Sequence, residues 1–124
     1  QKKIEEAYVI DKVYSLKDVT FELNCYNLNR ENLSELDSLA LYLIQNDELK
    51  LEIFGHTDDT GNKEHNLELS RKRAESVFDY LVEHGVSANR LSYFGFGSTI
   101  PKVPNKNEAN KTKNRRVEIK ILSH

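Results

Sequence analysis

The sequence has little of what would support anything other than an ordinary packed core. It contains one cysteine, Cys25, which excludes both an internal disulfide and a cysteine-based zinc finger. Its longest apolar run, residues 39–44, has six residues, whereas a membrane-spanning helix needs about 20. Eighteen basic residues stand against twenty acidic ones, so no global field would recruit nucleic acid or an anionic membrane.

The composition that remains is that of one globular domain. The chain has 124 residues, of which 38% are hydrophobic and 31% charged, and this balance is typical of a folded protein. We therefore expect a single domain over residues 1–124. Residues 1–15 are weakly patterned, with a short strand expected at 7–10. Because the sequence starts at Gln1 and contains no methionine, we interpret them as a lead-in from a larger parent protein.

Hydrophobic periodicity divides the rest of the chain into alternating strands and helices. Period-2 alternation predicts strands from residue 16 to about 22 and over 50–54, 91–94 and 117–121. Three- and four-residue spacing predicts helices over about 31–46 and 63–84, and a short third helix is expected within 105–114. The resulting order, β-α-β-α-β-(α)-β, predicts an α/β two-layer sandwich with helices packed on one face of the sheet. The alternation also predicts that the other face is partly wet.

Each long helix has a defined apolar stripe. In the first helix, the stripe is Leu33, Leu36, Ala40 and Leu43. Ser34 and Asp37 have the spacing of a capping box, although a start one turn earlier is also compatible with the pattern. In the second helix, the predicted stripe is Leu67, Ala74, Val77 and Leu81, and His84-Gly85 provides a C-terminal stop.

The densest polar cluster, His-Thr-Asp-Asp-Thr-Gly at 56–61, directly follows a buried-looking strand. Ligand sites in α/β sheets favour loops at the carboxyl ends of strands, but a plain Asx turn would produce the same pattern. Arg73 shares a helical stripe with Leu69 and Val77, and Asn66 lies two turns earlier on the same side. Arg73 either snorkels outward or points its guanidinium into a crevice beside the loop, where it would bind a carboxylate. In the second case, Asp58 would take a cationic group, and the pair would suit a zwitterionic amino acid.

Other polar residues carry weaker signals. Arg115 and Arg116 precede the last strand and should face opposite sides of it, either as site residues or as structural clasps on acidic groups. The four histidines show no metal-ligand spacing, and no nucleophile has an identifiable base. We therefore expect no metal site, no cofactor and no catalytic residues. The lone thiol of Cys25 is expected to be buried.

These residues together resemble the peptidoglycan-associated C-terminal domain of the OmpA family. The likeness covers about residues 16–122. It rests on the 19–24 strand with Leu28, on Gly55-His-Thr-Asp58, Gly61, Asn66, Leu69-Ser70, Arg73-Ala74, Val77, Tyr80-Leu81 and Gly85-Val86, and on Arg90-Leu91, Gly95-Phe-Gly97, Pro101 and Asn114-Arg-Arg-Val117.

The resemblance implies an OmpA-like sandwich with a mixed sheet. It also implies noncovalent binding of peptidoglycan through the diaminopimelate residue of its stem peptide. Asp58 and Arg73 match the residues that hold the two charged ends of that residue. Asn24 and Thr57 match further hydrogen-bonding positions, and Asn66 and Arg115 match secondary contacts. The implied location is the periplasmic face of the Gram-negative outer membrane, with the parent protein attached to a membrane.

The chain departs from the family pattern at one place. Where the family usually has a Gly-Arg pair four residues before the Asn-Arg-Arg run, this sequence has Asn110-Lys111. Lysine keeps the charge of arginine but not its planar fork. This change motivates an alternative function, a protein–protein interaction domain whose ligand crevice has lapsed. An enzymatic function is the third and weakest hypothesis. Under the leading hypothesis, peptidoglycan binding, Arg73→Ala is expected to abolish wall binding while leaving the fold intact.

Overall fold

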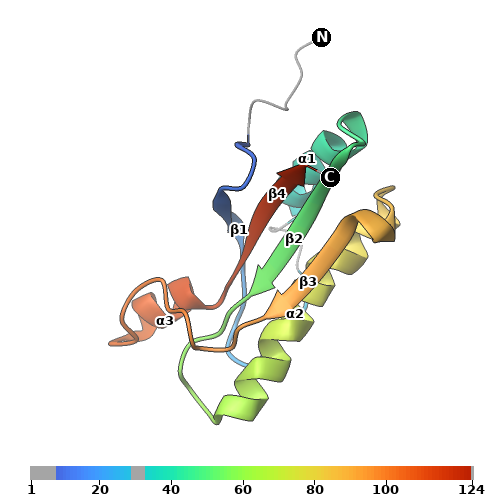
Figure 1. The fold of residues 1–124 in the computed structure, drawn as a ribbon. Helices are drawn as coiled ribbons and strands as arrows, with labels where there is room; N and C mark the ends of the chain where they lie inside the picture. Colours follow the sequence, from blue (N-terminus) through green and yellow to red (C-terminus); the bar gives the residue numbers. More distant parts are fainter. Residues whose placement is uncertain (1–7, 29–32, 124) are drawn as a thin grey trace.

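The computed structural model describes residues 8–28 and 33–123. The elements shown in Figure 1 are β1 (Val13–Thr20), α1 (Leu33–Gln45), β2 (Leu49–Gly55), α2 (Lys63–Glu83), the 3-10 turn η3 (Ala88–Arg90), β3 (Leu91–Gly95), α3 (Glu108–Asn114) and β4 (Arg116–Ser123).

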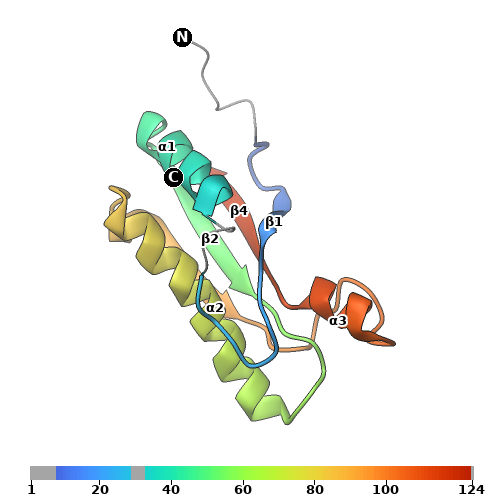
Figure 2. The ribbon, with the colours of Figure 1, turned by 180° about the vertical axis from the view of Figure 1, so that it is seen from behind.

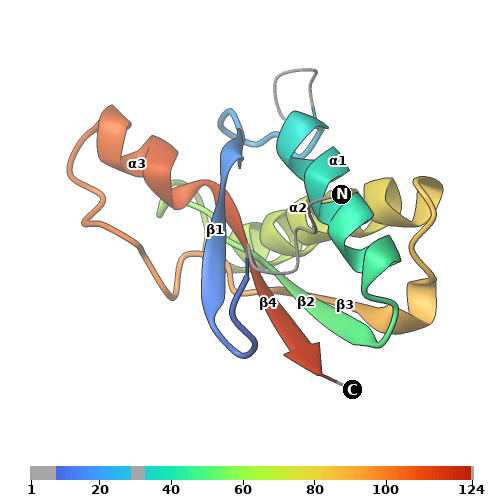
Figure 3. The same cartoon turned by 90° about the horizontal axis from the view of Figure 1, so that it is seen from above.

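The strands form one mixed sheet in the order β1-β4-β2-β3. β2 and β3 are parallel, and β4 runs antiparallel to both β1 and β2. Helices α1 and α2 cover the same face of the sheet, in front of the strands in Figure 2. The predicted α/β sandwich is thereby confirmed. The short α3 does not join that layer, and Figure 3 shows it beyond one end of the sheet.

The core lies between the sheet and the two long helices. In β2 the buried and less buried residues alternate over the whole strand, as predicted from the period-2 pattern. The apolar faces of α1 and α2 pack against the buried face of the sheet, so one continuous apolar core lies between the sheet and the two helices. Its members include Leu51, Ile53, Val117, Ile119 and Ile121 from the strands, and Leu36, Leu39, Leu43, Val77 and Leu81 from the helices.

The first strand was predicted with the wrong limits. β1 begins at Val13 and ends at Thr20, and Phe21 is buried just beyond it. Residues 8–10 form no strand, contrary to the expected lead-in strand, and Ala7 lies outside the described residues. The register of β1 against β4 shifts between Ser15 and Thr20. A bulged edge strand of this kind has no clean alternation to detect.

Two helix predictions also need correction. α1 begins at Leu33, so Ser34 is inside the helix and cannot be its cap, and the Asp37 carboxylate instead accepts a hydrogen bond from the Tyr80 hydroxyl. Leu67 is 40% exposed although it was assigned to the core stripe of α2, and Leu69 is buried. The other members of the predicted stripe, Ala74, Val77 and Leu81, are buried as expected, whereas Leu67 lies near the start of α2 beside Gly97, in the loop beyond the end of β3.

Two glycines allow α2 to approach the ends of the parallel strands. A β-carbon on Gly55 would lie 1.9 Å from the Ser70 carbonyl oxygen, and one on Gly95 would lie 2.5 Å from the Arg71 nitrogen. No side chain fits between backbone elements this close. This approach brings the middle of α2, including Arg73, beside the loop that follows β2.

Gly55→Ala is therefore expected to lower the free energy of unfolding by about 3–5 kcal/mol, because α2 must separate from β2 to admit the methyl group. Urea unfolding measures this loss. Gly61→Ala is the matched control: it has a φ of 87° but no atom nearer than 4.0 Å, so it should cost only about 1 kcal/mol from backbone strain. Equal losses in the two variants would contradict the packing argument.

Candidate functional site

The first three residues of the loop that follows β2 are buried although they have no regular secondary structure. His56, Thr57 and Asp58 are all buried. The loop continues the strand pairing by one bond on each side, because the His56 N–H donates to the Arg116 carbonyl at 3.0 Å and the Thr57 N–H donates to the Gly97 carbonyl at 2.9 Å. The sheet thus fixes the backbone that carries Asp58, and a site on such a backbone is preorganised.

Asp58 is 2% exposed, and both of its carboxylate oxygens are engaged. Oδ1 accepts the Thr60 N–H at 2.9 Å, so the Asx turn considered from the sequence is present. Oδ2 accepts Arg115 Nη1 at 2.7 Å. Burial raises the pKa of Asp58, but the hydrogen bonds from Thr60 and Arg115 outweigh it and hold that pKa below its ordinary value. Asp58 is therefore a fixed negative charge at neutral pH.

Arg115 connects three parts of the chain at this point. Its Nε donates to the Phe21 carbonyl at 2.7 Å, and its Nη2 donates to Glu108 at 2.7 Å and to Thr112 at 2.9 Å. Arg116 instead pairs with Glu118 at 3.0 Å. Both arginines thus clasp acidic groups, as one of the two sequence-based interpretations predicted. Arg115 does so at Asp58 itself, which makes it part of the candidate site.

Arg73 does not snorkel outward. Its exposure is 0%, and its guanidinium lies 4.9 Å from the centre of the Phe21 ring. It donates to three backbone carbonyls: Nε to Cys25 at 2.7 Å, Nη1 to His56 at 3.0 Å and Nη2 to Glu22 at 3.0 Å. Burial and the nearby charge of Arg115 lower the pKa of Arg73 to about 10 while Asp58 opposes them, so the group stays positive at neutral pH.

The other predicted site residues surround this pair. The Thr57 hydroxyl donates to the Asp58 carbonyl oxygen at 2.8 Å. Asn24 is exposed, has a φ of 62°, and its Oδ1 lies 3.0 Å from Nε2 of His65 on α2. Asn66 is buried in α2, and no hydrogen bond of its side chain to another predicted site residue is among the contacts described. Arg115 therefore contacts Asp58 directly. Arg73 is connected to this pair through the His56 carbonyl oxygen, to which it donates a hydrogen bond.

Sequence reasoning missed two charged partners here. Glu118 binds His56 Nε2 at 3.0 Å; burial raises its pKa, but His56 and Arg116 bring that pKa down to about 2. Glu108, in the first turn of α3, binds Arg115. Glu118 had a faint signal, since it alternates with buried residues in β4. Glu108 had none, because nothing in its local pattern separates it from a solvated charge.

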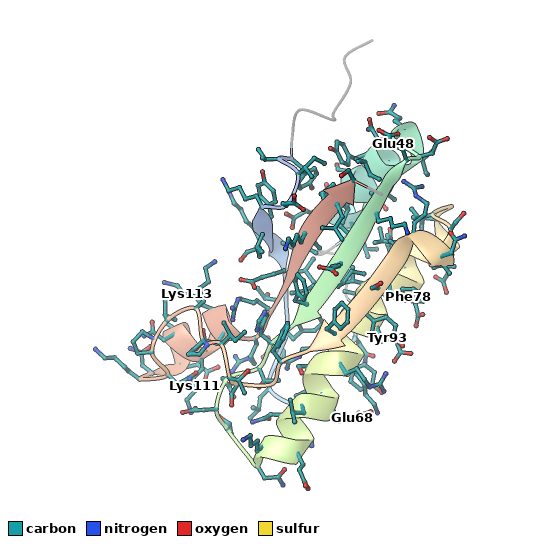
Figure 4. All side chains as sticks on the ribbon, viewed as in Figure 1. Glu48, Glu68, Phe78, Tyr93, Lys111 and Lys113 are labelled. Carbon is teal, nitrogen blue, oxygen red and sulfur yellow. The ribbon has the colours of Figure 1, made fainter. Side chains whose placement is uncertain are left out.

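Lys111 takes the place of the family arginine and lies on α3 near the loop after β2 (Figure 4). Its Nζ donates to the Thr60 hydroxyl at 3.1 Å and lies 3.6 Å from the Asp59 carboxylate. The positive charge is thus still directed at the loop that carries Asp58. A lysine makes these contacts as a point charge, without the bidentate geometry of arginine.

Cys25 is exposed, so the expectation that its thiol is buried was wrong. Its carbonyl accepts Arg73 Nε, which places the side chain at the margin of the site. We expect a thiol-reactive polyethylene glycol to label the folded protein within minutes and, if the chain binds cell-wall sacculi as its resemblance to the OmpA family implies, to weaken that retention at least tenfold by steric exclusion. Cys25→Ser treated with the same reagent is the control. Full retention after complete labelling would place the site elsewhere.

None of the helices within residues 8–28 and 33–123 is long and apolar enough to cross a membrane.

Comparison with known proteins identifies relatives over most of the chain. A model described as the OmpA family matches residues 20–115. A peptidoglycan-associated lipoprotein of Buchnera aphidicola is 33% identical over 107 residues, 86% of this chain and 62% of that protein. Outer membrane protein A of Klebsiella aerogenes is 39% identical over 100 residues, 78% of this chain and 29% of that protein. The chain spans 32%, 62% and 48% of the length of the first three curated relatives.

Solved structures agree with the sequence matches. The peptidoglycan-associated lipoprotein of Burkholderia pseudomallei has a TM-score of 0.82 at 30% identity, over 87% of this chain and 89% of that one. The C-terminal domain of Helicobacter pylori MotB has a TM-score of 0.77 at 33% identity, over 86% of this chain and 84% of that one. The matched family region contains the whole Asp58 loop, Arg73 and Arg115. The chain therefore belongs to the OmpA family.

Proposed function

We propose that this chain is a binding module, not an enzyme, that attaches its parent protein to peptidoglycan without a covalent bond. Its ligand is the diaminopimelate residue of the stem peptide. The observation that carries the proposal is the pair of buried, oppositely charged side chains at one end of the sheet: Asp58 in the loop after β2, and Arg73 on α2, which binds the His56 carbonyl of the same loop. Relatives named peptidoglycan-associated lipoproteins, which match most of the chain, support it.

The two charges suit the free end of diaminopimelate, which carries an ammonium and a carboxylate group on one carbon. A carboxylate has about four lone-pair sites and a guanidinium five N–H groups; Asp58 accepts from Arg115 and from the backbone and side chain of Thr60, and Arg73 makes three described bonds. Two of the carbonyls that Arg73 binds belong to Glu22 and Cys25, which lie in an exposed loop. Because Arg73 is fully buried, the ligand carboxylate reaches its guanidinium only when the segment of residues 22–25 moves aside; the carboxylate then replaces the Glu22 and Cys25 carbonyls, which turn to water.

The expected affinity is that of a tether. A charge-assisted hydrogen bond contributes about 1.5–3 kcal/mol net, and a few of them, less the cost of ordering the ligand, give dissociation constants of roughly micromolar to millimolar. Such weak sites suffice against a polymer that repeats its stem peptide at high local concentration. The proposed location is the periplasmic face of the Gram-negative outer membrane, with the parent protein attached to a membrane.

Sedimentation with purified sacculi tests the proposal. The wild-type protein should pellet with diaminopimelate-type sacculi and be released by free stem peptide. Asp79→Asn, which removes a charge from the exposed side of α2, should pellet equally well. If the wild type stays in the supernatant, the proposal fails.

One observation favours the alternative, a protein–protein interaction domain with a lapsed crevice. Every described polar contact of Arg73 is already made within the chain, and the group is fully buried. A nuclear magnetic resonance titration separates the two functions. Stem peptide that shifts the Asp58 and Arg73 signals supports wall binding, whereas no shift at millimolar peptide supports the alternative.

A further inference from the structure

Two carboxylates share one arginine at the candidate site. Arg115 donates from Nη1 to Asp58 and from Nη2 to Glu108, both at 2.7 Å. The two carboxylates differ in their surroundings, because Asp58 is buried whereas the Glu108 side chain is 76% exposed. The three groups come from the loop after β2, from α3 and from the residue between α3 and β4, so the fold has assembled them from separate segments.

Because Asp58 and Glu108 share the Arg115 guanidinium, Arg115 does not neutralise both carboxylates. An arginine paired with Asp58 alone would form a neutral unit with little attraction for a cation. The second carboxylate gives Asp58, Glu108 and Arg115 together one net negative charge, which stands beside the positive charge of the buried Arg73. Asp58 is buried, but the Glu108 side chain is 76% exposed and water screens its charge, so this charge changes the attraction for an ammonium group severalfold and not by orders of magnitude.

We propose that Glu108 is a positioning residue of this site: by sharing the Arg115 guanidinium with Asp58, it leaves the Asp58 carboxylate negative enough to accept the ammonium group of the ligand. The proposal rests on the function proposed above and adds to it a residue that tunes preference for a cationic ligand. Glu108 acts through Arg115 and not by touching the ligand.

The structure indicates that this role is separable from folding. The cap of α3 is Asn107, whose side chain accepts the Asn110 N–H at 2.9 Å, and Glu108 takes no part in that bond. Arg115 keeps its bonds to the Phe21 carbonyl and to Thr112 without Glu108. Glu108→Gln preserves the size of the side chain and removes only its charge. The variant is therefore expected to fold.

The test compares two ligands on the full chain, the diaminopimelate stem peptide and the same peptide with its side-chain amine acetylated. We expect Glu108→Gln to weaken binding of the free-amine peptide about fivefold to tenfold and to leave the affinity for the acetylated peptide unchanged. Glu68→Gln, which removes an exposed acid paired with Arg71 on α2, is the control and should match the wild type with both ligands.

Equal weakening with both peptides would show a merely structural role and overturn the proposal, as would no weakening with either. A carboxyl-carbon titration of Asp58 needs no ligand: loss of the Glu108 charge should lower the pKa of Asp58 further, and an unchanged midpoint would also overturn the proposal. If the wild type binds neither peptide, the proposed function fails, and this titration alone decides whether Glu108 shares Arg115 with Asp58.

Discussion

Asp58→Asn is expected to abolish retention on sacculi and to destabilise the fold at neutral pH. Asparagine keeps the volume of aspartate but removes the charge that would attract the ligand ammonium, so binding should fall at least 100-fold, on the order of 3 kcal/mol. The buried Arg115 would lose one of its two anionic partners, and breaking one side of a buried pair should cost about 2–3 kcal/mol of stability. Sedimentation and urea unfolding at pH 7 measure the two losses.

The difference in unfolding free energy between the wild type and Asp58→Asn should depend on pH in a direction that the pKa of Asp58 determines. The pKa of Asp58 is lower in the folded protein than its ordinary value, so its contribution to stability is complete above the unfolded value of about 4 and is lost as pH falls through the folded pKa. The stability gap between wild type and Asp58→Asn should therefore narrow below about pH 4. Asp59→Asn is the control. Because the Asp59 side chain is half exposed, this variant should lose little stability and little retention on sacculi. Normal sedimentation of Asp58→Asn would contradict the assigned role.

Arg73→Lys should lose both wall binding and stability. Lysine keeps the positive charge, but its single ammonium cannot reproduce the planar fork that donates to the carbonyls of Glu22, Cys25 and His56. Leaving some of these groups unpaired should lower the free energy of unfolding by about 2–4 kcal/mol. Binding to diaminopimelate peptide should weaken at least 30-fold. The same contacts argue against the expectation that Arg73→Ala leaves the fold intact, since alanine also opens a cavity.

Arg71→Lys is the matched control for Arg73→Lys. Arg71 is two residues away on α2, but its partners Glu68 and Glu75 are surface acids, so this variant should bind and unfold like the wild type. Calorimetry, with heteronuclear spectra to confirm folding, separates lost binding from lost structure. A folded Arg73→Lys protein that binds stem peptide with wild-type affinity would exclude Arg73 as the carboxylate-binding group.

The fold was predictable where burial follows a simple period. β2 alternates along its whole length, and its limits were predicted to within a residue or so. β1 was placed three residues late at its start because it is an edge strand with an irregular register. α3 was expected as a short helix, but its place beyond the sheet depends on contacts far along the chain.

The sequence predicts that Arg73 lies beside the loop that carries Asp58, but it does not predict which contacts these residues make. The stripe shared with Leu69 and Val77 allowed Arg73 either to snorkel outward or to point inward, and the structure shows that it is fully buried. Its carbonyl partners in the loop after β1 lie 48 and 51 residues away, and no local pattern specifies such pairs. Arg115 reaches Asp58 across 57 residues for the same reason. Local periodicity determines which way a side chain faces, whereas the tertiary fold determines what it meets.

A calorimetric titration with the diaminopimelate stem peptide, beside the peptide that carries lysine in its place, tests the central claim most directly. Lysine lacks the extra carboxylate, so Arg73 loses its partner while Asp58 keeps an ammonium to bind. The account predicts a dissociation constant in the micromolar to millimolar range for the first peptide and binding at least tenfold weaker for the second. Equal affinity for the two peptides, or no heat with either, would contradict it.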